Sequence, residues 1–248
     1  MRLTVVGCGD AFGSGGRLQT CYHFESAGQR FLIDCGATAV IGLNRLGLDT
    51  NCVGTIIISH LHGDHFAGLV WWMLHSQHVV KRTTPLTIIG PPTVEARFQA
   101  AAEALFPKST TVALRFPMIF REITAATPLD VPEIGRLTAY EVKHPSGAPS
   151  HALRLQTPTR TIAFSGDTEW VDALVPCGKE ADLYIMDCYA WDGKIPFHLS
   201  WETIRGNLPH IAARKTMLTH MSAPMLQRSR EATGPGVFLA EDGLVVDI

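Results

Sequence analysis

The sequence lacks the features that mark membrane, secreted and multi-domain proteins. Its 248 residues contain no run of about 18 apolar residues of the kind that spans a membrane. Met1 and Arg2 precede a short strand-like run, without the apolar core of a signal peptide. No low-complexity segment, charge block or Pro/Gly-rich linker divides the chain, and 46% hydrophobic residues can form a large core. We therefore expect one cytoplasmic domain over residues 1–248, with no membrane contact.

An excess of positive charge is also missing. The formal net charge is −2, and charged residues make up 18% of the chain. Proteins that grip a long nucleic acid usually carry a basic face. This balance argues against a nucleic-acid polymer as the substrate.

Paired cysteines are absent as well. The six cysteines form no C-x-x-C pair, so the sequence indicates neither a zinc ribbon nor a redox motif. They are Cys8, Cys21, Cys35, Cys52, Cys177 and Cys188. We expect them to be reduced and mostly to be packing residues.

What the sequence does contain is a mixed order of short strands and helices. Apolar runs bounded by turn formers predict strands at 3–7, 21–25, 30–34, 55–59, 86–89, 112–120, 136–143, 152–157, 161–165, 183–186, 215–218, 236–239 and 243–246. Helical patterns cover 38–46, 66–78, 93–106, 169–175, 200–207 and 223–231. Each half thus offers a sheet with helices for one face, and two packed sheets with helices outside is the natural layered solution.

The segment Ser59–His65 (SHLHGDH) concentrates residues that bind metals, directly after a buried strand. His60 and His62 can project to one side and clamp one ion. Asp64 and His65 begin a helix-like stretch that turns them toward a second position. Three histidines and an aspartate would be costly to bury without partners, and a metal is the simplest common partner. The alternative is that they are solvated or core residues without a ligand.

Three further candidates lie where predicted strands end. His144 precedes Pro145, and Asp167 and His220 each follow a short apolar run. Taken singly they are weak signals, because each histidine could be a surface or packing residue and Asp167 could be a helix N-cap. Taken together they complete two shells: His60, His62 and His144 for one ion, Asp64, His65 and His220 for the other, and Asp167 between them. Imidazole with carboxylate suits two divalent ions, Zn²⁺ first, with Mn²⁺, Fe²⁺ or Co²⁺ as alternatives.

These residues belong to a wider set of familiar motifs. The matching segments are Val6–Ala11, Asp34–Gly36, His60–His65, His144, Ser165–Thr168, Phe197–Ser200 and Leu218–His220. Through them the chain resembles the metallo-β-lactamase-fold hydrolases, and it is most similar to their ribonuclease Z-like phosphodiesterase branch. The resemblance covers nearly the whole length and implies an α/β fold, a four-layer αββα sandwich with the metal cleft where its halves meet.

The resemblance also implies a catalytic set of Asp64, His198 and Asp187. His198 matches a family histidine that faces the scissile phosphate and protonates the departing alkoxide, and Asp187 would orient it. Family ribonucleases usually carry glutamate in place of Asp187, so the shorter side chain alters the geometry of the pair. The alternative is that His198 is an ordinary loop histidine. Asp34 is expected to accept a hydrogen bond from a ligand imidazole or from the first loop.

The interval between His144 and Asp167 bears on the substrate. The two residues are 23 positions apart (167 − 144), which is enough for two strands and a turn. Family ribonucleases that mature transfer RNA typically insert a long basic arm in this interval. We therefore expect a small phosphodiester substrate, a cyclic nucleotide or cyclic phosphate, and a homodimer as is common in this branch. The cysteine-rich metal site of phosphonate-pathway cyclic phosphodiesterases has no counterpart around Cys8 and Cys21.

Other activities stay open at this point. The first alternative is a ribonuclease Z-like endoribonuclease that processes transfer RNA 3′ ends. The second is a lactonase, thioesterase or β-lactam-type amidase, although such carbonyl hydrolases do not generally require the His198 motif. A metal-stabilised binding protein and a sulfur dioxygenase with a single iron complete the list.

Overall fold

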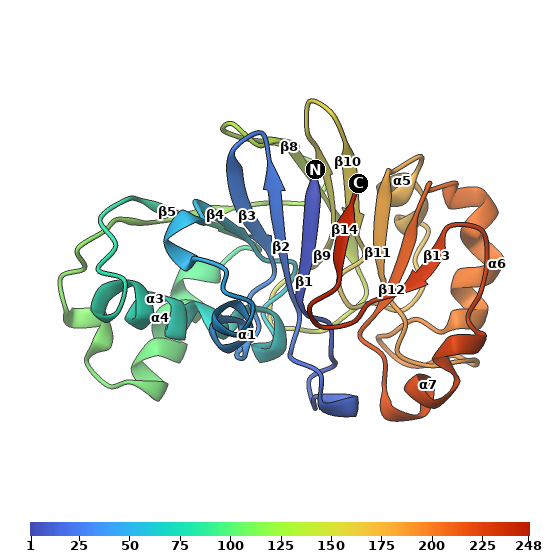
Figure 1. Cartoon of the computed structure of the whole chain (residues 1–248), viewed down its shortest axis with the longest axis horizontal. Helices are drawn as coiled ribbons and strands as arrows, with labels where there is room; N and C mark the ends of the chain where they lie inside the picture. The colour runs from blue at the N-terminus through green and yellow to red at the C-terminus, as the bar shows by residue number, and fades with distance from the viewer.

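Two seven-stranded sheets pack face to face, and helices cover the outer face of each sheet (Figure 1). The computed structural model describes residues 1–248. The first sheet has the order β14-β1-β2-β3-β4-β5-β6. Its strands are β1 (Arg2–Gly7), β2 (Cys21–Ser26), β3 (Gln29–Ile33), β4 (Thr55–Ile57), β5 (Leu86–Gly90), β6 (Met118–Glu122) and β14 (Val245–Asp247).

The second sheet repeats this design with the order β13-β12-β11-β10-β9-β8-β7. Its strands are β7 (Leu129–Val131), β8 (Gly135–Val142), β9 (Ser150–Gln156), β10 (Thr161–Phe164), β11 (Leu183–Asp187), β12 (Thr216–Thr219) and β13 (Val237–Leu239). In each sheet, strands β3 to β6 or β10 to β13 run parallel and the rest pair antiparallel. β8, β10, β11 and β12 consequently all run in one direction and end at the same edge.

Helices complete the outer layers. The first sheet is covered by α1 (Ala39–Arg45), α2 (Gly63–Phe66), α3 (Gly68–His78) and α4 (Val94–Leu105), and the second by α5 (Leu174–Gly178), α6 (Trp201–Ile211) and α7 (Ala223–Arg228) (Figure 1). Four short 3-10 helices lie at Ser14–Gly16, Thr50–Cys52, Ser109–Thr111 and Ser229–Glu231. No helix in the structure combines the length and apolar character that crossing a membrane requires.

Three apolar cores hold these layers together. One lies between the sheets and includes Tyr22 and Phe164, whose rings meet edge to face. The other two join each sheet to its helices, for example through Trp72 in α3 and Trp201 in α6. Inner parallel strands such as β11 are buried on both faces, which explains their continuous apolar sequence. The four-layer αββα sandwich implied by the resemblance is thus confirmed.

Some predicted elements are wrong in detail. The helix predicted at 169–175 begins only at Leu174, because Glu169 is engaged in contacts with Lys143 and with the backbone of Phe197. The strand predicted at 112–120 begins only at Met118. Pro117, just before it, has no N–H to donate.

Two further differences concern boundaries. The helix predicted at 66–78 starts earlier and is divided between α2 and α3 at Ala67. The edge strand β7 was not predicted, because Leu129–Val131 is too short for alternation to be recognised. The cysteines are free, and all are buried except Cys52, in agreement with the expected packing role.

Candidate metal centre

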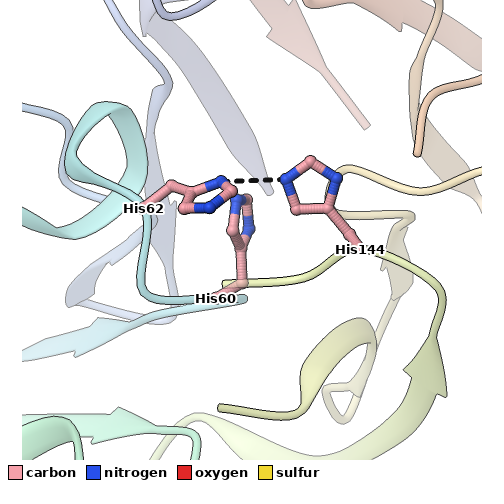
Figure 2. A group of neighbouring side chains, drawn as sticks. All are labelled: His60, His62 and His144. Carbon is pink, nitrogen blue, oxygen red and sulfur yellow. Dashed lines mark hydrogen bonds between the residues drawn. The ribbon is translucent and has the colours of Figure 1, made fainter. Parts of the chain in front are cut away.

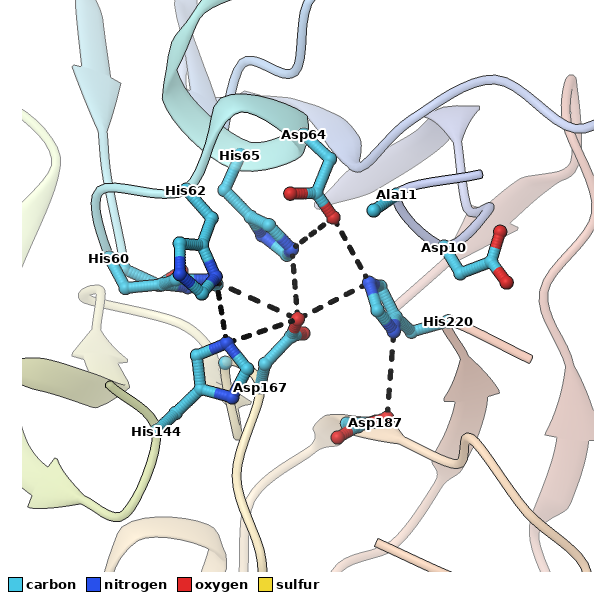
Figure 3. Close-up of polar contacts among 12 residues, drawn as sticks. Asp10, Ala11, His60, His62, Asp64, His65, His144, Asp167, Asp187 and His220 are labelled. Atoms are coloured by element: carbon cyan, nitrogen blue, oxygen red, sulfur yellow. Dashed lines mark hydrogen bonds and ion pairs between the residues drawn. The ribbon is translucent and has the colours of Figure 1, made fainter. Parts of the chain in front are cut away.

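The seven predicted ligands gather at one edge of the two sheets (Figure 3). His60 and His62 lie in the loop after β4, and Asp64 and His65 lie in α2, which follows directly. The second sheet contributes residues just beyond the ends of β8, β10 and β12, namely His144, Asp167 and His220. Because these three strands run in the same direction, their ends bring distant parts of the chain to one place.

His60, His62 and His144 form the first group (Figure 2). One ring nitrogen from each lies within 4.8 Å of the others. The Nδ1 of His62 is 2.9 Å from the Nε2 of His144, although 82 positions separate them in the sequence. The buried Nε2 of His60 has no hydrogen-bond partner. Such an arrangement can accept a cation that all three nitrogens face.

The second group combines two carboxylates with two imidazoles. It contains Asp64, His65, Asp167 and His220, all buried, and their ligand atoms also lie within 4.8 Å of one another. The Oδ2 of Asp64 is 3.3 Å from the Nε2 of both His65 and His220. The Oδ2 of Asp167 is 3.2 Å from the same two nitrogens.

Asp167 reaches both groups. Besides its contacts with the second group, its Oδ2 lies 3.8 Å from the Nε2 of His60 and 4.0 Å from the Nε2 of His144. A single carboxylate oxygen therefore stands between two sets of imidazoles (Figure 3). This is the position expected of a ligand shared by two ions.

The rings of the predicted ligands are held on their far side by further polar groups. The Nδ1 of His65 is 2.7 Å from the Oδ2 of Asp34. Asp34 also accepts hydrogen bonds from the backbone N–H and the hydroxyl of Ser59, each at 2.7 Å. The hydrogen bonds expected for Asp34, from a ligand imidazole and from the first loop, are therefore both present. The Nδ1 of His144 donates to the carbonyl of Phe197 at 2.9 Å, which leaves its Nε2 free to face the group.

The backbone around the site is strained. Asp34, Phe197 and His220 adopt left-handed conformations with φ of 58°, 68° and 56°. Such angles are unfavourable for residues with a side chain and persist where surrounding contacts impose them. For His220 one such contact is the hydrogen bond from its N–H to the carbonyl of Cys8, at 3.0 Å.

Close packing beneath α2 requires glycine. A Cβ built on Gly36 would lie 2.3 Å from the carbonyl oxygen of Asp64. The loop after β3, which carries Asp34, therefore packs directly against the turn that carries the two predicted ligands of α2. No other residue type fits this contact without displacing them.

The electrostatics of the second group favour a cation. Burial alone would raise the pKa of Asp167, but the charges of His220 and His65 outweigh burial and hold this pKa well below its usual value. Burial would lower the pKa of His220, but the Asp167 carboxylate raises it to about 9. The carboxylates thus concentrate negative charge that protons on the imidazoles or a divalent ion can neutralise.

The donor set therefore fits a divalent metal. Burial, followed by repulsion from His65, lowers the pKa of His60 well below its usual value, so His60 is in the neutral form that binds metals. The buried Nε2 atoms of His60 and His65 have no hydrogen-bond partner, and both point into the cluster. Mixed imidazole and carboxylate ligands are those of hydrolytic zinc sites.

His198 lies at the margin of this cluster. Its Nδ1 is 3.0 Å from the Oδ2 of Asp187, the last residue of β11. Asp187 is fully buried, and its Oδ2 also accepts from the backbone N–H of Leu199 at 3.3 Å. Ligand atoms of His198, Asp187, Asp167 and His220 lie within 4.8 Å of one another. The shorter aspartate therefore still reaches the histidine.

Burial would lower the pKa of His198, but attraction and hydrogen bonding by Asp187 raise it above its usual value. The side chain remains 18% exposed, so it can meet a molecule from solvent. A histidine that holds a proton near neutral pH can act as an acid.

Several site residues were not predicted from the sequence. Ser59 supports Asp34 and contacts the Nδ1 of His60 at 3.0 Å, and the only sequence signal was its place before the histidine motif. The carbonyl of Phe197 and the ring of Tyr189, which stacks on His198, depend on loop conformations. His151 is buried in β9, and its backbone N–H donates to the carbonyl of Ser59 at 3.1 Å.

Comparisons with known proteins agree with this geometry. A family model described as anti-Pycsar protein Apyc1 matches residues 1–244. A probable metallo-hydrolase, YhfI of Bacillus subtilis, is 23% identical over 227 residues, which cover 89% of this chain and 87% of the relative. The structure of the short form of human tRNase Z superposes with a TM-score of 0.80 at 25% identity, covering 100% of this chain and 99% of that chain.

A third similar structure is a diphosphatase of the PhnP family, with a TM-score of 0.79 and 18% identity. It covers 100% of this chain and 97% of the other. At this identity the likeness shows the fold alone. The fold is the metallo-β-lactamase fold, and the relatives of the chain include metallo-hydrolases and ribonuclease Z-like proteins.

Proposed function

The chain belongs to the Apyc1 family of anti-Pycsar proteins, and from this membership and the geometry above we propose that it is a metal-dependent phosphodiesterase. The proposed substrate is a small phosphodiester, either a cyclic nucleotide or another cyclic phosphate. Metal-dependent hydrolysis itself follows from the family and its metallo-hydrolase relatives. Our proposal adds that the bond hydrolysed is a phosphodiester.

The observation that carries the proposal is the pair of His198 and Asp187 beside the carboxylate and imidazole cluster. Hydrolysis of an alkyl phosphodiester expels a poorly stabilised alkoxide, which needs a proton as it leaves. The buried Asp187 fixes the Nδ1 side of His198 at 3.0 Å. The opposite ring nitrogen, Nε2, is then available to donate a proton to the leaving oxygen.

The metal ligands of the proposal are the two groups described above. His60, His62 and His144 would hold one divalent ion, Asp64, His65 and His220 the other, and Asp167 would contact both. Two such ions would lower the pKa of a water and neutralise charge on the phosphoryl group. We expect zinc, with manganese, iron or cobalt as alternatives.

The chain's own residues have distinct tasks in this proposal. Asp34 and Ser59 keep His65 and His60 in the orientation in which their Nε2 atoms face the cluster. Asp187 holds the tautomer of His198 in which Nδ1 carries a hydrogen. Because the pKa of His198 is raised, its Nε2 can carry a proton as well, and this is the proton that it would donate. Asp64, which is 7% exposed, would act from within the second ligand group.

The short connection between His144 and Asp167 favours a small substrate. It contains β9, β10 and a turn at 157–160, and so leaves no room for an inserted arm. The near-neutral charge balance is no obstacle to a ligand with one or two negative charges. A substrate of this size could be held by the metals and a few polar walls.

A ribonuclease Z-like activity is the second candidate. The specific observation in its favour is the similarity to human tRNase Z over essentially the full length of both chains. An enzyme of this kind would grip transfer RNA by a surface other than the missing arm. Carbonyl hydrolysis remains a third candidate that uses the same metal ligands.

Activity screening separates these candidates. Purified protein loaded with zinc or manganese should hydrolyse bis(p-nitrophenyl) phosphate and cyclic AMP or cyclic GMP, and leave a lactone and a precursor transfer RNA intact. Linear dinucleotides test whether a cyclic ester is required. Turnover of the lactone alone would overturn the proposal, and cleavage of the precursor transfer RNA alone would favour the second candidate. Light scattering tests the expected homodimer.

A further inference from the structure

The aromatic ring of Tyr189 lies against the imidazole of His198. Their centroids are 4.6 Å apart and the rings are inclined by only 24°, so the two faces stack. Tyr189 belongs to none of the predicted ligand groups, and its hydroxyl forms no hydrogen bond to them. We propose that Tyr189 is a positioning residue that holds the His198 ring in the orientation required for proton donation. This inference rests on the proposed function.

His198 needs such a restraint because one hydrogen bond does not fix a ring. The contact from its Nδ1 to Asp187 leaves the imidazole free to tilt about that bond, and the residue lies in a loop before α6. Other rings border it less closely. The His220 ring is nearly parallel to it at 5.3 Å, and the His144 ring meets it edge to face at 5.1 Å. Tyr189 makes the shortest ring contact of the three.

Tyr189 is itself well anchored. Its carbonyl accepts hydrogen bonds from the hydroxyl of Ser222 at 2.6 Å and from the backbone N–H of Ser222 at 3.2 Å. The same hydroxyl accepts from Met225 N–H and caps α7. Ser222 lies two residues after His220, and Tyr189 lies two residues after Asp187. The loop with the orienting carboxylate is therefore tied to the loop with a metal ligand.

The chain also keeps Tyr189 and His198 adjacent. Ala190 N–H donates to the carbonyl of Leu199 at 3.3 Å, and Trp201 N–H donates to the carbonyl of Ala190 at 2.8 Å. The segments 189–190 and 199–201 thus run side by side as an isolated bridge. This backbone pairing places the two side chains close enough for their rings to stack.

The chemistry of the stack suits a proton donor. A tyrosine ring presents the negative face of its quadrupole, which attracts a cationic group within about 6 Å of its centroid. A leucine in its place would fill space but supply neither the flat surface nor this attraction. A phenylalanine would supply both, because the hydroxyl is not part of the contact.

The test compares leaving groups in Tyr189→Phe, Tyr189→Leu, His198→Asn and the double variant Tyr189→Leu/His198→Asn. The alkoxide expelled from cyclic AMP needs a proton, whereas p-nitrophenolate leaves without one. We expect Tyr189→Leu to lower kcat for cyclic AMP on the order of tenfold, and kcat for bis(p-nitrophenyl) phosphate by less than about twofold. Tyr189→Phe should stay within about twofold of the unmodified enzyme for both substrates.

The double variant isolates the coupling. Once His198 is replaced by asparagine, adding Tyr189→Leu should change kcat for cyclic AMP by less than about twofold, because its effect passes through the imidazole. A change in KM with unchanged kcat would instead show that Tyr189 contacts the substrate, and would overturn the positioning role. Equal losses for both leaving groups would also overturn it.

A second readout needs no activity. In NMR spectra of the metal-free protein, the ring protons of His198 should shift in Tyr189→Leu, and remain close to their original positions in Tyr189→Phe. Unshifted ring protons in Tyr189→Leu would refute the stack itself. If no phosphodiester is cleaved by the unmodified enzyme, the proposed function fails while the NMR result still decides whether the stack exists.

Discussion

The Nδ1 of His65 lies 2.7 Å from the Oδ2 of Asp34, and both side chains are completely buried. Burial acts to raise the pKa of Asp34 above its usual value, although contacts with His65 and Ser59 oppose this effect. The pair connects the end of β3 to the helix that carries two proposed ligands. The first sheet therefore holds the Nδ1 side of His65, while its Nε2 faces Asp167 from the second sheet.

Replacement of Asp34 tests this connection. Asp34→Asn keeps the shape but weakens the acceptor for His65, so metal affinity should fall by about 10- to 100-fold, as is typical when the partner of a ligand imidazole is lost. Competition with a chelator measures the affinity. Asp130→Asn, at an exposed position of β7, is the matched control and should retain full affinity. Equal affinity in the two variants would contradict the orienting role.

The ligand assignment predicts a joint loss of metal and activity. His62→Ala or Asp167→Ala should abolish phosphodiesterase activity and lower the metal content of the purified protein, because each removes a donor that faces the cluster. Elemental analysis by mass spectrometry gives the metal content per chain. His78→Ala, at an exposed position of α3, provides the control. One iron per chain in the unmodified protein would instead favour the dioxygenase reading.

His198 should behave differently from the ligands. His198→Ala is expected to lower turnover of cyclic AMP by roughly 10²- to 10⁴-fold, the range typical of a lost general acid, while metal content stays unchanged. Steady-state kinetics and elemental analysis on the same preparation check both parts. Loss of metal in this variant would show that the acid role is wrong.

The burial of His151 should make the stability of the protein depend on pH. Its side chain is 1% exposed, its Nδ1 has no partner, and burial lowers its pKa from 6.5 to about 4. Between these values the unfolded chain binds a proton that the folded protein does not. Neutral His151 therefore contributes its full share to the free energy of unfolding above pH 6.5. This share, about 3 kcal/mol in total, is lost as the pH falls toward 4.

Urea unfolding of the metal-free protein at pH 7 and pH 4.5 measures this effect. In His151→Leu the free energy of unfolding should fall less between the two pH values than in the unmodified protein, because the titrating group is gone. Other histidines contribute equally to both proteins and cancel in the comparison. Identical falls in the two proteins would contradict the prediction.

Replacement of Arg82 should lower the stability of the fold, because this residue lies outside the proposed metal centre and binds backbone carbonyls. The residue is 2% exposed, and its guanidinium donates to four backbone carbonyls, those of Thr84, Thr50, Asn51 and Pro85. Arg82→Met removes a hydrogen bond from each of these acceptors, of which the Thr50 carbonyl keeps only the one from Val53 N–H, and should lower the free energy of unfolding on the order of 3 kcal/mol. Chemical denaturation checks the value, and the exposed Arg45→Met is the control. A loss as small as that of the control would show that water replaces the guanidinium.

The sequence predicted the candidate metal site and most of the strands and helices, because both depend on short local patterns of residues. The density of histidines from His60 to His65 predicted a metal site, and the strands before His144, Asp167 and His220 predicted where further ligands would lie. The structure brings these seven side chains together. Sheet order could not be predicted from apolar runs, because every inner strand has a similar sequence.

Features that arise from tertiary contacts were missed. Glu169 lies in a helical pattern, but its carboxylate accepts from Lys143 and Phe197, and the chain there does not form a helix. Tyr189 carried a weak signal as an aromatic residue two positions after Asp187. Its stacking on His198 could not be foreseen, because it depends on the pairing of 189–190 with 199–201.

The proposed ligands come from opposite halves of the chain, and this has a mechanical consequence. An ion held by His62 and His144 would act as a cross-link that closes a loop of 82 residues and latches the two sheets at one edge. Closing a long loop reduces the conformational freedom of the unfolded chain, and ligands that bind only the folded form raise its stability. Resistance to unfolding should therefore rise with metal loading, so that a melting curve reports how completely the centre is filled.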